Sequence, residues 1–237
     1  RISINIFLVI LLSWFFVALL FSNSVSASPE EDVDKLRNLF STGQNYLQNG
    51  QYDNALPILK EALKISKESG NNNSDNIQIL QLIGHAQRGL IKYESAIETY
   101  TQALKITEDA NMEAISALLL NNLGDTYYLW ERYEEAINRF SKALDISRRL
   151  KKKADTGYLL SMIGNTYMRI SELDKAKEFY QKALVINRNL GNNILITKNL
   201  NGIGVIHKQK GRLKEAYDFF SEALKMSQEL GADLESG

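Results

Sequence analysis

The stretch NNLGDTYYLWERYEEAINRFSKALDI, from Asn121 to Ile146, determines the architecture of this chain because the segments on both sides of it repeat its pattern. Its first part spaces three residues as one face of a helix does: Leu123, Gly124 and Tyr127. Its second part gives a similar spacing to another three: Ala136, Phe140 and Ala143. Glu131 and Arg132 stand between the two parts. The stretch therefore predicts two helices joined by a short turn.

The glycine of this stretch is one of five that recur every 40 or 41 residues: Gly43, Gly84, Gly124, Gly164 and Gly204. A leucine stands four residues before each of them: Leu39, Leu80, Leu120, Leu160 and Leu200. An alanine stands twelve residues after each: Ala55, Ala96, Ala136, Ala176 and Ala216. A large apolar or aromatic residue stands sixteen residues after each: Leu59, Tyr100, Phe140, Tyr180 and Phe220. A fixed period of this size indicates stacked units that cannot bury their apolar faces alone.

The repeated glycines need a packing reason, because glycine inside a helix costs about 1 kcal/mol relative to alanine. Close approach of the partner helix supplies that reason, and the repeated alanines do the same for the second helix of each unit. An added methylene at Ala136 or Ala176 would overpack the contact at a cost of roughly 1 to 3 kcal/mol.

The pattern L-G-x-x-Y followed by A-x-x-x-F-x-x-A resembles the tetratricopeptide repeat, and the resemblance covers five units from about Leu36 to Leu230. Two features depart from the family: its tryptophan is leucine in all five units, and the proline that closes a unit of about 34 residues is absent. The longer period is similar to that of kinesin light chains and of bacterial repeat arrays linked to sensor or effector domains. The resemblance implies an all-α fold, an α-solenoid of five helical hairpins in a right-handed superhelix, with a concave groove lined by the first helices.

The predicted units lie at about 36–70, 77–110, 114–150, 154–190 and 194–230, within a repeat region of 36–231. Residues 232–237 are expected to begin a sixth unit, because they take the place of Asn192 to Thr197 one period earlier. Residues 28–35, which include Glu30, Glu31 and Asp32, are expected to form an acidic linker before the first unit.

The first 27 residues predict export. The run from Ile6 to Phe21 is apolar apart from Ser13, and small residues follow it up to Ala27. This arrangement is typical of a secretory signal cleaved after Ala27. The segment also approaches the roughly 20 apolar residues of a membrane-spanning helix, so an uncleaved anchor is the second interpretation. Either one places the repeats in the periplasm, outside the cell, or at a membrane surface.

The first helices carry a second face beside the core face, and the family builds its groove from that face. The residues of this second face stand three residues before, one residue after and four residues after each repeated glycine. In units two to five they are Gln81, His85 and Arg88; Asn121, Asp125 and Tyr128; Ser161, Asn165 and Met168; and Asn201, Val205 and Lys208. In unit one they are Phe40, Gln44 and Leu47. Amides, which donate and accept hydrogen bonds, dominate the middle of this strip and suit the backbone of an extended peptide. No lysine stands three residues before a glycine, so the family's carboxylate clamp is not expected.

The composition does not favour catalysis or nucleic-acid binding. Lysine plus arginine equals aspartate plus glutamate at 28 each, which provides no net field for an anionic partner. There is no cysteine, and the two histidines, His85 and His207, stand beside no nucleophile motif. His207 occupies a column that holds tyrosine in three other units and is expected to be a packing residue. We therefore predict no enzyme activity, no cofactor and no metal site.

Together these features predict an exported, non-catalytic scaffold that binds a protein or peptide segment in its groove. The membrane enters this prediction only through the N-terminal segment, and exposed apolar positions at the ends of the array allow self-association. The alternative is a sensory or regulatory repeat region of a longer effector enzyme, such as a caspase-like peptidase or a kinase.

Overall fold

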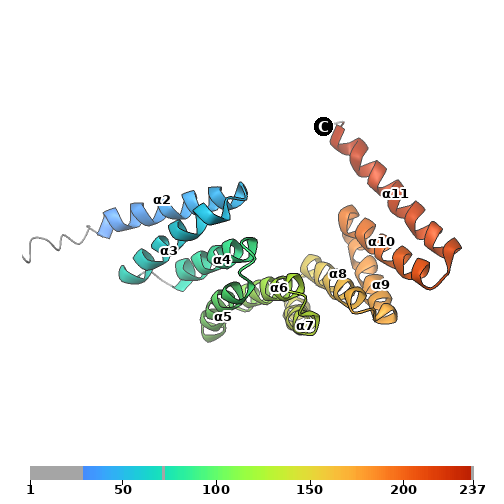
Figure 1. Ribbon diagram of the computed structural model, residues 1–237, viewed down its shortest axis with the longest axis horizontal. Helices are drawn as coiled ribbons and strands as arrows, with labels where there is room; N and C mark the ends of the chain where they lie inside the picture. The colour runs from blue at the N-terminus through green and yellow to red at the C-terminus, as the bar shows by residue number, and fades with distance from the viewer. Residues whose placement is uncertain (1–28, 71–72, 236–237) are drawn as a thin grey trace, which may run out of the picture.

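A computed structural model describes residues 29–70 and 73–235. The described residues form ten helices that alternate in direction along the chain (Figure 1). They are α2 (Pro29–Gln48), α3 (Tyr52–Glu68), α4 (Asn73–Gly89), α5 (Tyr93–Asp109), α6 (Glu113–Leu129), α7 (Tyr133–Arg149), α8 (Lys153–Arg169), α9 (Leu173–Leu190), α10 (Asn193–Gln209) and α11 (Leu213–Glu235).

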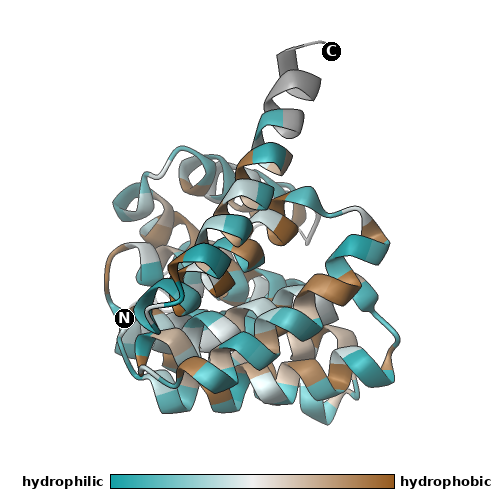
Figure 2. Ribbon diagram, turned by 90° about the vertical axis from the view of Figure 1, so that its right-hand side faces the viewer, coloured by the Kyte–Doolittle hydropathy of each residue, from teal (hydrophilic) through white to brown (hydrophobic). Residues whose placement is uncertain are grey.

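Each helix packs on the helix before it and the helix after it, which gives five antiparallel hairpins stacked in a solenoid. The solenoid curves into an arc, with α4 and α6 nearer its inner side and α5 and α7 along its outer side (Figure 1). Individual helices carry both apolar and polar residues, as expected of helices that bury one side (Figure 2). The predicted all-α solenoid of five hairpins is confirmed.

The repeated glycines lie where the two helices of a hairpin meet. A Cβ atom at Gly124 would stand 2.5 Å from the Phe140 ring, and one at Gly84 would stand 2.6 Å from the Tyr100 ring. Phe140 is completely buried, and so are Ala136 and Ala143. The glycine column therefore makes room for the aromatic column of the partner helix.

The turns between helices use a left-handed residue about every twenty positions. Four of these residues are glycines, and five are not: Ile91, Asn111, Glu131, Lys151 and Ser171. At the first turn predicted from the sequence, the Glu131 amide donates to the Tyr128 carbonyl at 3.1 Å and the Arg132 amide donates to the Tyr127 carbonyl at 2.9 Å. These bonds satisfy carbonyls at the end of α6 and reverse the chain.

Two boundary predictions differ from the structure. Residues 29–35, expected in an acidic linker, belong to α2. Pro29 suits the first turn of a helix, and the carboxylates that follow favour the positive end of the helix dipole. The sixth unit expected from residue 232 does not begin there, because α11 continues without a turn to Glu235. One period earlier, Asn192 caps α10 by accepting from the Leu195 amide at 3.1 Å.

The predicted signal or anchor at residues 1–27 lies outside the described residues. Within 29–70 and 73–235, no helix is both long and apolar enough to cross a membrane.

Candidate binding groove

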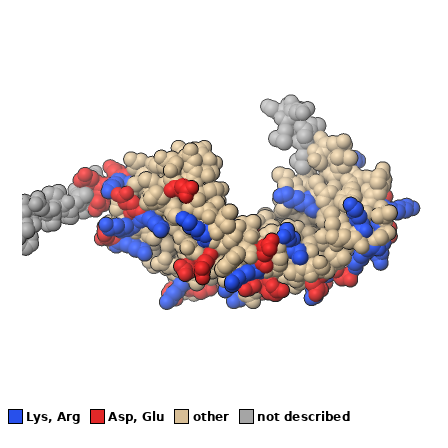
Figure 3. Space-filling view, viewed as in Figure 1, with Lys and Arg blue, Asp and Glu red and all other residues tan. Residues whose placement is uncertain are grey.

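The first helices α4 and α6 lie nearer the inner side of the arc (Figure 1). In Figure 3 the molecule is hollowed on that side, and charged side chains are concentrated along the opposite, lower edge. Three surface hollows are lined mainly by residues of α2, α4, α6 and α8. The chemistry of these hollows changes along the solenoid, and the predicted groove residues are distributed unequally among them.

The central hollow gathers four of the predicted groove residues and has a volume of about 380 Å³. The four are His85, Arg88, Asp125 and Tyr128. The remaining lining residues were not predicted: Tyr52, Gly89, Leu129 and Met162. Leu129 follows Asp125 by one helical turn, so helical spacing could have identified it. Tyr52 comes from a second helix, and no spacing rule within a first helix could have found it.

Arg88 and Asp125 form an ion pair across two units. The closest approach is 3.7 Å, between Nη1 of Arg88 and Oδ2 of Asp125, and the two side chains are only 19% and 21% exposed. That separation is too long for a hydrogen bond. Within the described part of the chain, neither side chain makes a hydrogen bond to another residue. Both partners therefore keep their hydrogen-bonding capacity while being largely covered.

Burial raises the pKa of the Asp125 carboxyl to about 6, and the nearby Arg88 guanidinium opposes that shift only in part. Burial also raises the pKa of Tyr100 and of Tyr158 to about 12, so that both phenols stay protonated. Burial and the charge of Arg88 lower the pKa of His85. The His85 ring lies 6.0 Å from the Tyr52 ring. At neutral pH the hollow therefore contains one cation, one anion and a neutral imidazole.

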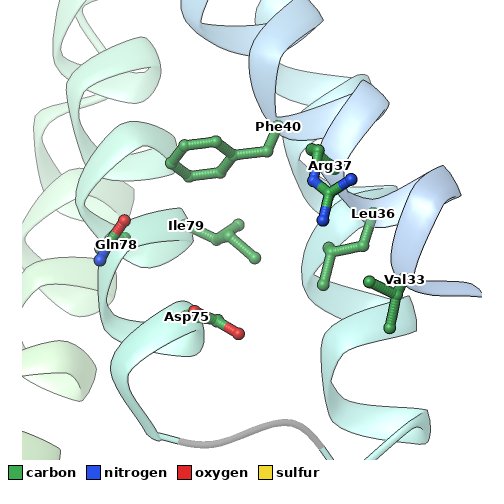
Figure 4. A pocket seen from close by; sticks show the side chains of 7 residues that line it. All are labelled: Val33, Leu36, Arg37, Phe40, Asp75, Gln78 and Ile79. Carbon is green, nitrogen blue, oxygen red and sulfur yellow. The ribbon is translucent and has the colours of Figure 1, made fainter.

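A second kind of hollow lies between the N-terminal halves of neighbouring first helices. One is formed by α2 and α4, where Val33, Leu36, Phe40 and Ile79 surround the space together with Arg37, Asp75 and Gln78 (Figure 4). The other lies between α6 and α8, two units later. It has lining residues at the same places in the repeat: Ala114, Ala117, Leu118, Asn121, Asp155, Tyr158 and Leu159. Ser147 and Lys152 complete the lining of the second hollow. The groove therefore has a hollow of mixed apolar and polar lining at the same register in units one and three.

The other predicted groove residues are not equally available to a ligand. Ser161 is buried and donates to the Gly157 carbonyl at 2.9 Å within its own helix. The Asn165 amide oxygen accepts from the Tyr180 hydroxyl at 2.7 Å. Met168 is half-buried, whereas Asn201 and Lys208 are exposed on α10. The α8 part of the strip is therefore largely committed to internal contacts.

Two amides of the strip keep unpaired atoms. Nε2 of Gln81 and Oδ1 of Asn121 are covered, and neither has a hydrogen-bond partner among the described residues. Covered polar atoms without a partner are costly, and a ligand that supplies one removes that cost. Asn121 lines the hollow between α6 and α8 together with Tyr158.

The two histidines differ in their surroundings. His207 is buried beside Phe219, with ring centroids 5.3 Å apart, as expected of a packing residue. His85 lies in the central hollow. No cluster of three or more potential metal ligands occurs in the described ranges 29–70 and 73–235.

Several solved structures share the fold of this chain. BtubC (BKLC) from P. vanneervenii is 18% identical, with a TM-score of 0.72 over 87% of this chain and 93% of that one. A putative kinesin light chain of Podospora anserina with nearly identical repeats is 13% identical, with a TM-score of 0.70 over 82% and 96% of the two chains. MamA is 21% identical, with a TM-score of 0.61 over 80% and 96%. At these identities the likeness shows the fold alone. No curated protein matches the sequence.

The tetratricopeptide repeat pattern itself matches most of the chain, over residues 39–109, 115–189 and 155–229. The matched segments contain all five repeated glycines and all five repeated alanines. Proteins built from this repeat generally serve as protein-binding scaffolds. This chain belongs to the tetratricopeptide repeat family.

Proposed function

We propose that the chain is a non-catalytic adaptor that holds a peptide, or a segment of a partner protein, along the first-helix side of its solenoid. The observation that carries the proposal is the series of three hollows along α2, α4, α6 and α8. A polypeptide can span several units, whereas a small molecule would occupy one hollow only.

The chemistry of the hollows supports a polypeptide ligand. Exposed apolar side chains stand in each of them: Val33 is 43% exposed, Leu118 is 51% exposed and Leu129 is 49% exposed. Amides, tyrosines and the Arg88–Asp125 pair stand between these apolar side chains. A ligand with apolar residues spaced along a polar backbone would match this alternation.

Export is the second part of the proposal. It is supported by the apolar run from Ile6 to Phe21 and by the small residues that lead to Ala27. The mass of the protein recovered from its native source tests this part. Loss of residues 1–27 supports a cleaved signal, retention together with membrane association supports an anchor, and retention in a soluble cytosolic protein contradicts export.

A selection of random 12-residue peptides displayed on phage tests the groove. Selected peptides should lose at least tenfold in affinity when Leu129→Glu places a charge in the central hollow. The matched control is Val185→Glu on α9, because Val185 is also exposed, at 63%, and lines none of the three hollows. Loss of binding in the control with retention in Leu129→Glu would show that peptides bind elsewhere.

A further inference from the structure

The Arg88–Asp125 pair is incomplete as an ion pair. Its two groups are 3.7 Å apart and largely covered, and among the described residues neither makes a hydrogen bond. A guanidinium can donate five hydrogen bonds and a carboxylate accepts several, so both retain capacity toward the hollow. A ligand in the hollow can therefore form charge-assisted hydrogen bonds to both groups.

The hollow around the pair is electrically neutral. Apart from Arg88 and Asp125, its lining residues are aromatic, apolar or neutral at pH 7. A fully charged ligand group would therefore be attracted by one member of the pair and repelled by the other. The group that fits best carries a donor and an acceptor side by side.

A side-chain carboxamide has that arrangement, because its C=O and one of its N–H bonds lie on the same edge. The backbone peptide unit does not, because its trans geometry directs the N–H and the C=O to opposite sides. The pair therefore distinguishes asparagine or glutamine from plain backbone.

We propose that the Arg88–Asp125 pair is a subsite that recognises the side-chain carboxamide of an asparagine or glutamine in the bound polypeptide. Arg88 donates to the carboxamide oxygen, and Asp125 accepts from the carboxamide N–H. This inference rests on the proposed peptide-binding function and adds a residue preference at one ligand position.

A change of preference with pH follows, because the Asp125 carboxyl has a pKa of about 6. Below that pH the protonated Asp125 donates instead of accepting, and Arg88 keeps its charge. A carboxylate then fits in place of the carboxamide, so aspartate or glutamate becomes acceptable. The titratable groups around Asp125 on the packed helices are Tyr52, His85, Arg88, Tyr100, Tyr158 and, on its own helix, Tyr128.

Phage selection at pH 7.5 tests the subsite by comparing the wild-type chain with Arg88→Leu/Asp125→Leu, which removes both charges together. The wild-type pool should be enriched in asparagine or glutamine at one position, and the double variant should lose that enrichment while keeping the apolar positions. The control is Arg188→Leu/Glu222→Leu, which removes an ion pair between α9 and α11 and should keep the enrichment.

A second measurement needs only the wild-type chain, so it does not depend on how the variants fold. In a selected peptide, replacing the enriched Asn by Asp should weaken binding about tenfold at pH 7.5 and much less at pH 5. Replacing it by Leu should weaken binding at both pH values.

The outcomes separate this inference from the proposed function. Peptides selected without a carboxamide preference, or with one that persists in Arg88→Leu/Asp125→Leu, contradict the subsite and leave the groove intact. Equal losses for the Asp peptide at both pH values also contradict the subsite. Failure to select any peptide contradicts the proposed function and the subsite together.

Discussion

Helices α6 and α8 occupy equivalent places in consecutive units, yet they present different surfaces to the groove. On α6, Asp125 lines the central hollow without a hydrogen bond to any other described residue. On α8, the equivalent Asn165 accepts from the Tyr180 hydroxyl at 2.7 Å. The residue equivalent to Tyr180 in the α6 unit is Phe140, which has no hydroxyl.

The comparison shows that a residue of the second helix can decide whether a groove residue is available, as Tyr180 does for Asn165. A tyrosine sixteen residues after the glycine can donate a hydrogen bond to the groove residue of the first helix. A phenylalanine at that position cannot, so the groove residue stays available to a ligand. The groove therefore cannot be read from the first helices alone.

The largest effect is expected when the packing glycine that α6 and α8 share is replaced. Gly124→Val and Gly164→Val should each lower the free energy of unfolding by roughly 3 kcal/mol, because even a Cβ would stand 2.5 Å from the Phe140 ring and 2.8 Å from the Tyr180 ring. Urea unfolding followed by circular dichroism measures this. Wild-type stability in both variants would show that the glycine column is not a packing requirement.

The next largest effect is expected when Asp125 on α6 is replaced by asparagine, the residue that α8 has at the equivalent position. For Asp125→Asn we expect a gain in stability relative to wild type that grows as pH rises. The folded-state pKa of about 6 lies above the ordinary value, so folded wild type binds more protons than the unfolded chain between about pH 4 and 6. As pH rises through that window, wild-type stability should therefore fall by about 3 kcal/mol relative to the variant. Parallel pH profiles for the two proteins would mean that Asp125 titrates normally.

A smaller effect is expected when the aromatic residues of the second helices, Tyr180 and Phe140, are each replaced by the other type. Tyr180→Phe should cost about 1 kcal/mol, because it removes the hydroxyl that Asn165 accepts from. Phe140→Tyr should place a hydroxyl beneath Asp125 and lower the pKa of that carboxyl, since a hydrogen bond to the charged form favours it. Carboxyl NMR titration of Asp125 measures the second change. An unshifted pKa would contradict control of α6 from the second helix.

The smallest effect compares the turns that follow α6 and α8. Glu131 and Ser171 both have left-handed backbones, with φ of 61° and 62°. Ser171→Gly should stabilise the chain by about 0.5 kcal/mol, because glycine adopts this conformation without strain. Glu131→Gly should gain less, since Glu131 also pairs with Arg169 at 3.4 Å. Thermal unfolding of the two variants would show whether the order is as expected.

The repeat columns predicted the solenoid because they record packing, which is the same in every unit. Gly124 and Phe140 illustrate this: each is recognisable from its period and lies where the period places it. The groove was predicted in position but not in detail. His85, Arg88, Asp125 and Tyr128 do share one hollow, yet Ser161 and Asn165 are occupied by contacts that no spacing within α8 reveals. The ends of the array were least predictable. Residues 29–35 and 232–235 extend the first and last helices beyond the repeated positions, so the period gives no information about them.

Photo-crosslinking tests the central claim, that ligands bind on the first-helix side, most directly. A photoreactive residue replaces Leu129 in the central hollow or Val185 on α9, and a selected peptide is added before irradiation. We expect the peptide to be crosslinked from position 129 and not from position 185, in a manner that unlabelled peptide suppresses. Crosslinking from position 185 alone would contradict the claim and place the binding surface on the second helices.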